Sequence, residues 1–164
     1  MDGASLGNPS KVGGGGIIRD SEGRWVKGFA RSIGFTTSII AELWAPRDGL
    51  LLADQIGVQN LWIELDAKVV VELVQSDSTS NAFYSPLLAN CRSLLGRFHH
   101  CKVHHVFREV NRVADALAKL GCHMQENFVI MDNSPSDVVS NFLYSDAMGE
   151  NLCRLTATNL AILA

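Results

Sequence analysis

The spacing of hydrophobic and polar residues changes along the chain, and each change predicts a different element. The first 34 residues are rich in glycine and carry two β-type runs, 15–20 and 24–34, which are separated only by Ser21, Glu22 and Gly23. Two such runs joined by a short turn that contains glycine are typical of a β-hairpin. We therefore expect antiparallel strands near the start of the chain.

A helix is predicted from Ser38, the expected N-cap, to Gly57. Its hydrophobic residues recur at helical spacing, at Ile40, Leu43, Trp44, Leu50 and Leu51. Pro46 interrupts the pattern, because a proline inside a helix cannot donate to the carbonyl of Glu42 and costs about 3 kcal/mol. This helix should therefore bend after Glu42 or begin later.

Strands and helices alternate in the rest of the chain, which together with the hairpin calls for an α/β fold with a mixed sheet. The predicted elements are strands over 60–67 and 101–107, helices over 68–76 and 85–98, and a helix capped by Asn111 and stopped by Gly121.

The hydrophobic pattern loosens after Met124. We therefore assign residues 1–124 to one domain and residues 125–164 to a C-terminal appendage. Within the appendage, Pro135 is expected to start a short helix that runs through Leu143.

Composition narrows the class of protein. The chain has 164 residues, of which 47% are hydrophobic and 19% charged, as in one globular domain. No run approaches the roughly 18 apolar residues that span a bilayer, and no signal-peptide pattern is present at the start. We expect an intracellular protein, nuclear or cytoplasmic, that does not bind a membrane and is a monomer.

Charge and cysteine content add little chemistry of their own. The net charge of −3 argues against a strongly electrostatic nucleic-acid binder, although residues 1–124 carry 13 Lys and Arg against 12 Asp and Glu. The four cysteines, Cys91, Cys101, Cys122 and Cys153, form no CxxC pair, so we expect reduced and mostly buried thiols.

Four carboxylates stand at the ends of predicted elements: Asp2, Glu42, Asp66 and Asp115. Taken singly, each has an ordinary explanation, since Glu42 and Asp115 are expected in first helical turns, where acids are stabilised, and Asp66 ends a strand. Together on one spot they would repel one another unless a cation were bound, and hard oxygen ligands suit Mg²⁺ or Mn²⁺. Spacing alone does not establish that they converge.

Five segments in order, from Asp2 to Gly121, resemble the ribonuclease H family, and within it the plant reverse-transcriptase-like domains related to non-LTR retroelements. They are "DGASLGNP", "GGIIRDSEGRWVKGFA", "AELWAPRDGL", "IELDA" and "REVNRVADALAKLG". The resemblance implies a ribonuclease H-like fold, a five-stranded mixed sheet flanked by helices. Because the chain starts one residue before Asp2, the first strand is expected to be truncated and its neighbours to expose unpaired backbone groups.

The resemblance also implies a reaction and a substrate. Asp2, Glu42, Asp66 and Asp115 would hold two Mg²⁺ (or Mn²⁺) ions, which activate water and stabilise the departing 3′ oxygen of an RNA phosphodiester. His105 would assist proton transfer and product release. The substrate would be an RNA/DNA hybrid recognised by its shape and its 2′-hydroxyls. The residues expected to contact it are Gly3, Gly7, Asn8, Pro9, Ser38 and Asn111.

Two functions from different classes remain open. The first is a metal-dependent endonuclease that cuts the RNA strand of RNA/DNA hybrids. The second is a retroelement-derived, catalytically impaired module that binds nucleic acid or a protein without cleavage. The four acids favour the first; the truncated start, Pro46 and the residues Ser38, Ile39 and Ile40, where the family usually has polar side chains, favour the second.

Overall fold

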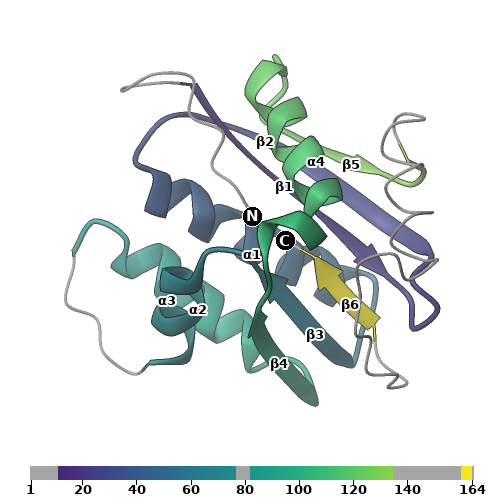
Figure 1. Ribbon diagram of the computed structural model, residues 1–164. Coiled ribbons are helices and arrows are strands. Elements are labelled where there is room, and N and C mark those ends of the chain that lie inside the picture. The colour runs from purple at the N-terminus through teal and green to yellow at the C-terminus, as the bar shows by residue number, and fades with distance from the viewer. Residues whose placement is uncertain (1–10, 77–81, 135–159, 164) are drawn as a thin grey trace.

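A computed structural model of the protein describes residues 11–76, 82–134 and 160–163, and in this part of the chain a mixed sheet carries helices on both faces (Figure 1). The predicted α/β class is therefore confirmed. The predicted C-terminal helix from Pro135 lies outside the described residues, as does Cys153.

The elements follow the predicted order closely. They are β1 (Lys11–Arg19), β2 (Trp25–Phe35), α1 (Ser38–Gln55), β3 (Asn60–Leu65), α2 (Lys68–Gln75), α3 (Ser85–Leu95), β4 (His100–His105), a 3-10 turn (Arg108–Val110), α4 (Arg112–His123), β5 (Phe128–Met131) and β6 (Leu160–Leu163).

The predicted hairpin is present and its turn is fixed by one side chain. Strands β1 and β2 pair antiparallel. Asp20 Oδ1 accepts hydrogen bonds from the backbone N–H groups of Glu22 and Arg24, at 3.0 and 2.9 Å. Gly23 has a φ of 78°, a conformation in which a side chain would be strained. Local turn chemistry therefore sets the start of the sheet.

Among the described residues, the sheet has six strands in the order β4-β3-β6-β1-β2-β5. Strand β6 lies between β1 and β3, antiparallel to the first and parallel to the second. The expectation that the strands beside the central position expose unpaired backbone is therefore wrong for the pairs Ile17↔Leu163 and Ile63↔Ile162, because a segment from the far end of the chain fills this position. Both added strands, β5 and β6, come from residues 125–164.

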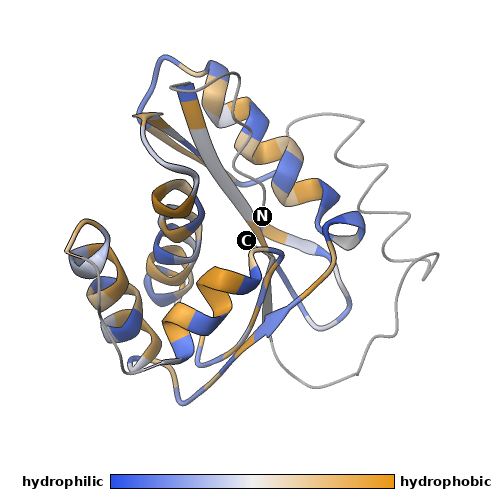
Figure 2. Ribbon diagram, turned by 60° about the vertical axis from the view of Figure 1, so that its left-hand side comes forward, coloured by the Kyte–Doolittle hydropathy of each residue, from blue (hydrophilic) through white to orange (hydrophobic). Residues whose placement is uncertain are grey.

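Helices α1 and α4 pack on opposite faces of β1, and three successive glycines show this. A Cβ on Gly13 or Gly15 would come within 2.3 to 2.4 Å of the backbone of α4. A Cβ on Gly14 would point the other way, towards Ala45 of α1 at 3.9 Å. Figure 2 shows α4 on one side of the sheet and α1, α2 and α3 on the other.

The larger core lies on the side of α1, α2 and α3. Its buried side chains include Phe29, Leu43, Leu50, Leu61, Ile63 and Leu88. A smaller cluster of Ile17, Val113 and Leu117 lies under α4. The alternation predicted for residues 61–65 is present, with Leu61, Ile63 and Leu65 buried and the residues between them half-buried.

Helix α1 departs from prediction at its start. Its N-cap is Thr37 rather than Ser38, and it begins at Ser38, so of the two effects expected of Pro46 the later start is wrong. Pro46 is buried inside the helix. The helix ends close to the predicted Gly57, whose φ is 77°. Packing against the sheet therefore holds α1 together across the proline.

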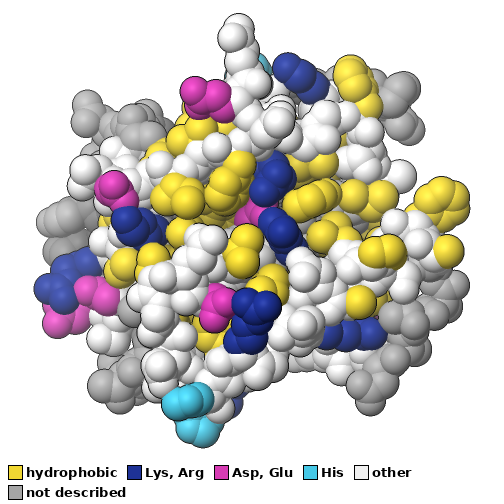
Figure 3. All heavy atoms as spheres, turned by 180° about the vertical axis from the view of Figure 1, so that it is seen from behind, with side chains coloured by type: hydrophobic (Ala, Val, Ile, Leu, Met, Phe, Trp, Pro, Cys, Tyr) yellow, Lys and Arg dark blue, Asp and Glu magenta, His cyan; other side chains and the backbone are white. Residues whose placement is uncertain are grey.

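Six residues after Glu42, α1 carries a buried carboxylate between two arginines. Asp48 is 1% exposed and accepts hydrogen bonds from Arg31 Nη2 at 3.0 Å and Arg47 Nη1 at 2.7 Å. The Arg31 guanidinium also lies 4.6 Å from the ring centroids of both Trp44 and Phe128. Acidic and basic side chains meet among hydrophobic ones on the face seen in Figure 3. This cluster joins α1 to β2 and β5.

Helix α4 departs from prediction at its end. It runs to His123, two residues past Gly121. Gly121 does not stop the helix; it allows close packing, because a Cβ there would lie 2.3 Å from the carbonyl oxygen of Arg31. Ala114, Leu117 and Ala118, which recur at helical spacing, are buried and form the apolar stripe of α4.

The described cysteines are free thiols, and none has a catalytic environment. Burial raises the pKa of Cys91 to about 12 and that of Cys101 to about 11, so both are neutral and unreactive at ordinary pH. Among the described residues there is also no helix long and apolar enough to span a membrane.

The contact between α4 and β1 predicts that alanine substitutions at Gly13 and Gly15 destabilise the protein more than one at Gly14. Gly13→Ala or Gly15→Ala should each cost about 1–3 kcal/mol or more, because the added methyl meets backbone that cannot rotate away. In a thermal melt this corresponds to a loss of roughly 2–4 °C per kcal/mol for a chain of this size. Gly14→Ala is the matched control, since its nearest neighbour is the flexible Ile33 side chain at 3.3 Å. Equal losses at all three positions would contradict this packing.

The central position of β6 gives a second prediction. Ile162→Pro should lower the melting temperature clearly, because a proline in a strand with neighbours on both sides removes a ladder hydrogen bond. Leu160→Pro, at the first residue of the same strand, where proline is tolerated, should cost much less. A melting temperature unchanged by Ile162→Pro would show that β6 is not part of the folded sheet.

Candidate active site

Two of the predicted catalytic residues meet where β3 and β4 end. The two strands are parallel, with Leu65 paired to His105, so Asp66 and His105 emerge at the same edge of the sheet. His105 Nε2 lies 3.1 Å from the carbonyl oxygen of Asp66. A carbonyl only accepts, so Nε2 carries the hydrogen in this contact, and in the neutral imidazole Nδ1 is then the acceptor. The neighbouring Val106 N–H donates to the Leu65 carbonyl at 2.9 Å, which fixes the same corner.

Glu42 lies in α1, but not in its first turn as predicted. The helix begins at Ser38, and its first turn holds no acid. Glu42 is therefore placed by packing of α1 on the sheet, with Ala41 and Leu43 on either side fully buried. It is itself half-buried. A helix end does not stabilise its charge.

Asp115 lies in the first turn of α4, as predicted, and is already engaged by two cations. Lys119 Nζ donates to Asp115 Oδ2 at 2.5 Å, and Arg108 Nη2 lies 3.5 Å from Oδ1. The Asp115 side chain is 18% exposed, whereas both basic side chains are 56% exposed. Sequence analysis did not identify these two partners, although the four-residue spacing of Asp115 and Lys119 on a helix is a readable signal.

The three acids share one feature that fits a hard cation. One carboxylate oxygen of each, in Glu42, Asp66 and Asp115, is shielded from solvent. Carboxylate oxygens are the ligands that Mg²⁺ and Mn²⁺ prefer, so the donor chemistry fits the predicted ions. Within residues 11–76, 82–134 and 160–163, however, no group of three or more His, Cys, Asp and Glu side chains is close enough to hold a metal ion.

Several predicted site residues cannot be placed. Asp2, Gly3, Gly7, Asn8 and Pro9 lie outside the described residues. The other two predicted nucleic-acid contacts differ from each other. Ser38 is exposed at the first residue of α1. Asn111 occupies the predicted N-cap position of α4, but its side chain is only 1% exposed and makes no capping hydrogen bond.

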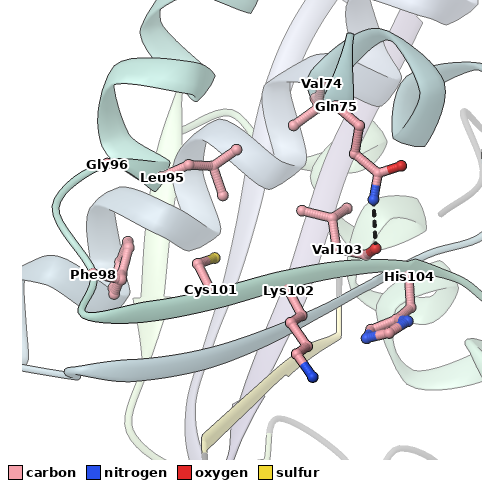
Figure 4. Close-up of a pocket in the computed structure, with 9 residues that line it drawn as sticks. All are labelled: Val74, Gln75, Leu95, Gly96, Phe98, Cys101, Lys102, Val103 and His104. Carbon is pink, nitrogen blue, oxygen red and sulfur yellow. Dashed lines mark hydrogen bonds between the residues drawn. The ribbon is translucent and has the colours of Figure 1, made fainter.

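The chain also has a pocket of about 590 Å³ away from these acids. It lies between β4 and the helices α2 and α3, and Val74, Leu95 and Val103 line it (Figure 4). Gln75 Nε2 donates to the Val103 carbonyl at 2.9 Å and so occupies part of the outer edge of β4. The pocket contains none of the predicted catalytic residues.

A mixed sheet of this kind, with acids at the ends of β3 and α4 and a third on α1, defines a ribonuclease H-like domain, and solved structures agree. Ribonuclease H1 from Halobacterium salinarum matches with a TM-score of 0.65 and 30% identity, over 73% of this chain and 92% of that one. The N-terminal ribonuclease H domain of Rv2228c from Mycobacterium tuberculosis matches with a TM-score of 0.69 and 26% identity, over 74% of this chain and 88% of that one. LC11-RNase H1, solved with an RNA/DNA hybrid, shares the fold at 23% identity and a TM-score of 0.66, over 74% of this chain and 92% of that one.

Residues 1–121 match the family described as reverse transcriptase-like, and the chain belongs to this family. A curated Arabidopsis thaliana protein named "Putative ribonuclease H protein" is 34% identical over 148 residues, which is 90% of this chain. The chain spans about a quarter of that protein's length, 24%. The resemblance seen in the sequence is therefore confirmed at the level of family and fold.

Proposed function

We propose that this domain is a metal-dependent endonuclease that hydrolyses the RNA strand of RNA/DNA hybrids. The observation that carries the proposal is the corner where Asp66 and His105 meet, in a ribonuclease H-like fold whose other acids come from α1 and α4. The family and the two relatives above 25% identity that are themselves ribonucleases H support the same substrate class.

Each residue has a distinct part in this proposal. Glu42, Asp66 and Asp115, with Asp2 as the fourth acid, would hold two Mg²⁺ or Mn²⁺ ions. When bound, such ions supply a nucleophilic hydroxide and stabilise the leaving oxygen. His105, fixed through its Nε2–H on the Asp66 carbonyl, presents Nδ1 as a proton acceptor beside the reacting phosphate. No side chain needs to act as the nucleophile.

A second candidate function is a module that binds nucleic acid without cutting it. One observation favours it: Asp115 is already neutralised by Lys119 and Arg108, so a ligand expected to hold a cation has cationic partners from the protein. In this case the hybrid would still bind, but divalent ions would change neither its affinity nor its integrity.

Asp66→Asn separates the two functions. If the domain is a nuclease, this variant should lose at least ~100-fold in hydrolysis of a labelled hybrid with Mg²⁺, because a direct ligand should matter at least as much as the partners that orient ligands. The fold should survive, since the change keeps the side-chain volume. Asp54→Asn is the control, because Asp54 lies at the far end of α1 and pairs with Arg97. Hybrid binding by the unmodified protein without any cleavage would favour the second function.

His105→Ala should slow turnover without abolishing it. We expect kcat to fall roughly 100-fold with KM nearly unchanged, because general acid–base assistance is lost while the carboxylates still act. His123→Ala, at the end of α4 where the imidazole Nδ1 lies 2.8 Å from the Lys119 carbonyl oxygen, is the matched control. A rise in KM with constant kcat would instead assign His105 to substrate binding.

A further inference from the structure

Trp62 on β3 forms an aromatic and basic surface with two side chains of β4. The ring centroids of Trp62 and His104 are 5.6 Å apart, and the rings are inclined by 51°. Lys102 Nζ lies 5.7 Å from the Trp62 centroid, in cation–π contact. Trp62 is half-buried, and the two β4 side chains are exposed. His100, two residues before Lys102 on β4, is also exposed and belongs to the same surface. We call the set Trp62, His100, Lys102 and His104 the Trp62 platform.

The platform is on the face of the sheet turned away from α2 and α3. Figure 4 shows Lys102 and His104 pointing to one side of β4, while Val103 and Cys101 point to the other, towards the helices. On the platform side α4 packs on β1 and β2. None of the described helices covers β3 and β4 on this side to a comparable extent. This half of the face therefore remains accessible in the part of the chain that the structure describes.

The strand that supplies the platform is locally basic although the protein is acidic. Residues 97–108 contain Arg97, Lys102, Arg108 and four of the five histidines of the chain, and no Asp or Glu. Glu64, opposite His104 on β3, is the acid that shares the platform's face. A ligand with negative groups along a flexible backbone complements this charge pattern, and one with flat rings complements the tryptophan.

The platform is continuous with the candidate active site. Trp62 and Glu64 lie on the same face of β3, and Asp66 follows two residues after Glu64, just beyond the end of the strand. Asp66 is four positions after Trp62, which is about 13 Å along an extended chain. A nucleic-acid strand that leaves the acids can therefore reach the tryptophan directly along β3.

We propose that the Trp62 platform binds an unpaired nucleotide segment that extends from the hybrid held at the candidate active site. Bases stack on Trp62 and His104, and Lys102 and His100 contact phosphates. A partly exposed aromatic ring beside basic side chains suits single strands, because every base offers a face for stacking, whereas a duplex hides its base faces. The proposal rests on the proposed function only in taking nucleic acid as the ligand.

Binding is measured as fluorescence anisotropy of a labelled oligouridine with the full chain. Trp62→Leu should weaken binding about 5- to 100-fold, the range expected from loss of one stacked base. Trp62→Phe, which keeps an aromatic face, should restore most of the affinity. Lys102→Gln should lower the slope of log affinity against log salt by about 1. The matched control is Lys27→Gln, which removes the same charge from β2, where Lys27 pairs with Asp132.

Equal oligouridine affinity in Trp62→Leu and the unmodified protein, both folded by thermal melt, would overturn the proposal. So would equal salt slopes in Lys102→Gln and Lys27→Gln, a comparison that holds even if Trp62→Leu fails to fold. Cleavage of a blunt hybrid distinguishes failure of the Trp62 platform proposal from failure of the proposed nuclease function. Trp62→Leu should cut the blunt hybrid normally and lose only the preference for a hybrid with a single-stranded RNA extension. If oligouridine binding depends on Trp62 but the protein cleaves no hybrid, the Trp62 platform is supported and the proposed nuclease function is not.

Discussion

The backbone hydrogen bonds of β6 hold the two halves of the sheet together. On one side are β4 and β3, on the other β1, β2 and β5, and β6 pairs with both groups. Buried backbone groups must find partners, so this central position needs an extended segment whatever its side chains are. The match to the family ends at residue 121, which means that the segment filling the centre of the sheet comes from outside the matched part. The position of Asp66 depends on it too, since β6 runs parallel to β3 as far as Glu64.

A second constraint, the close approach of α4 to β1, determines where chemistry can occur. The helix fits because Gly13, Gly15 and Gly121 carry no side chain at the contact. Fixed in this way, α4 covers β1 and β2 and presents Asp115 from its first turn. The same placement leaves β3 and β4 accessible beside the acids. The site and the Trp62 platform are thus both consequences of one packing contact.

Local patterns predicted most elements, and failures occur where distant contacts decide. The hairpin, the alternation of residues 61–65 and the stripe of α4 follow from turn chemistry and period, which act over a few residues. Gly121 was misread because the sequence does not show that β2 passes over it. Strand β6 could not be predicted, because four apolar residues have no distinguishing period and their partners are about 100 or more residues away.

The site was predicted from the resemblance rather than from spacing, and the structure adds what neither supplied, namely the partners of the acids. Asp66 gains the hydrogen-bonded His105 at its carbonyl. Asp115 gains Lys119 and Arg108, whose presence at first favours the module that does not cut. Yet both basic side chains are 56% exposed, and exposed ion pairs contribute only about 0–1 kcal/mol. A divalent ion that binds Asp115 therefore displaces little, since Lys119 can turn into solvent. The ion pair neutralises the carboxylate in the absence of metal and is too weak to exclude the metal, so it is compatible with metal binding at Asp115.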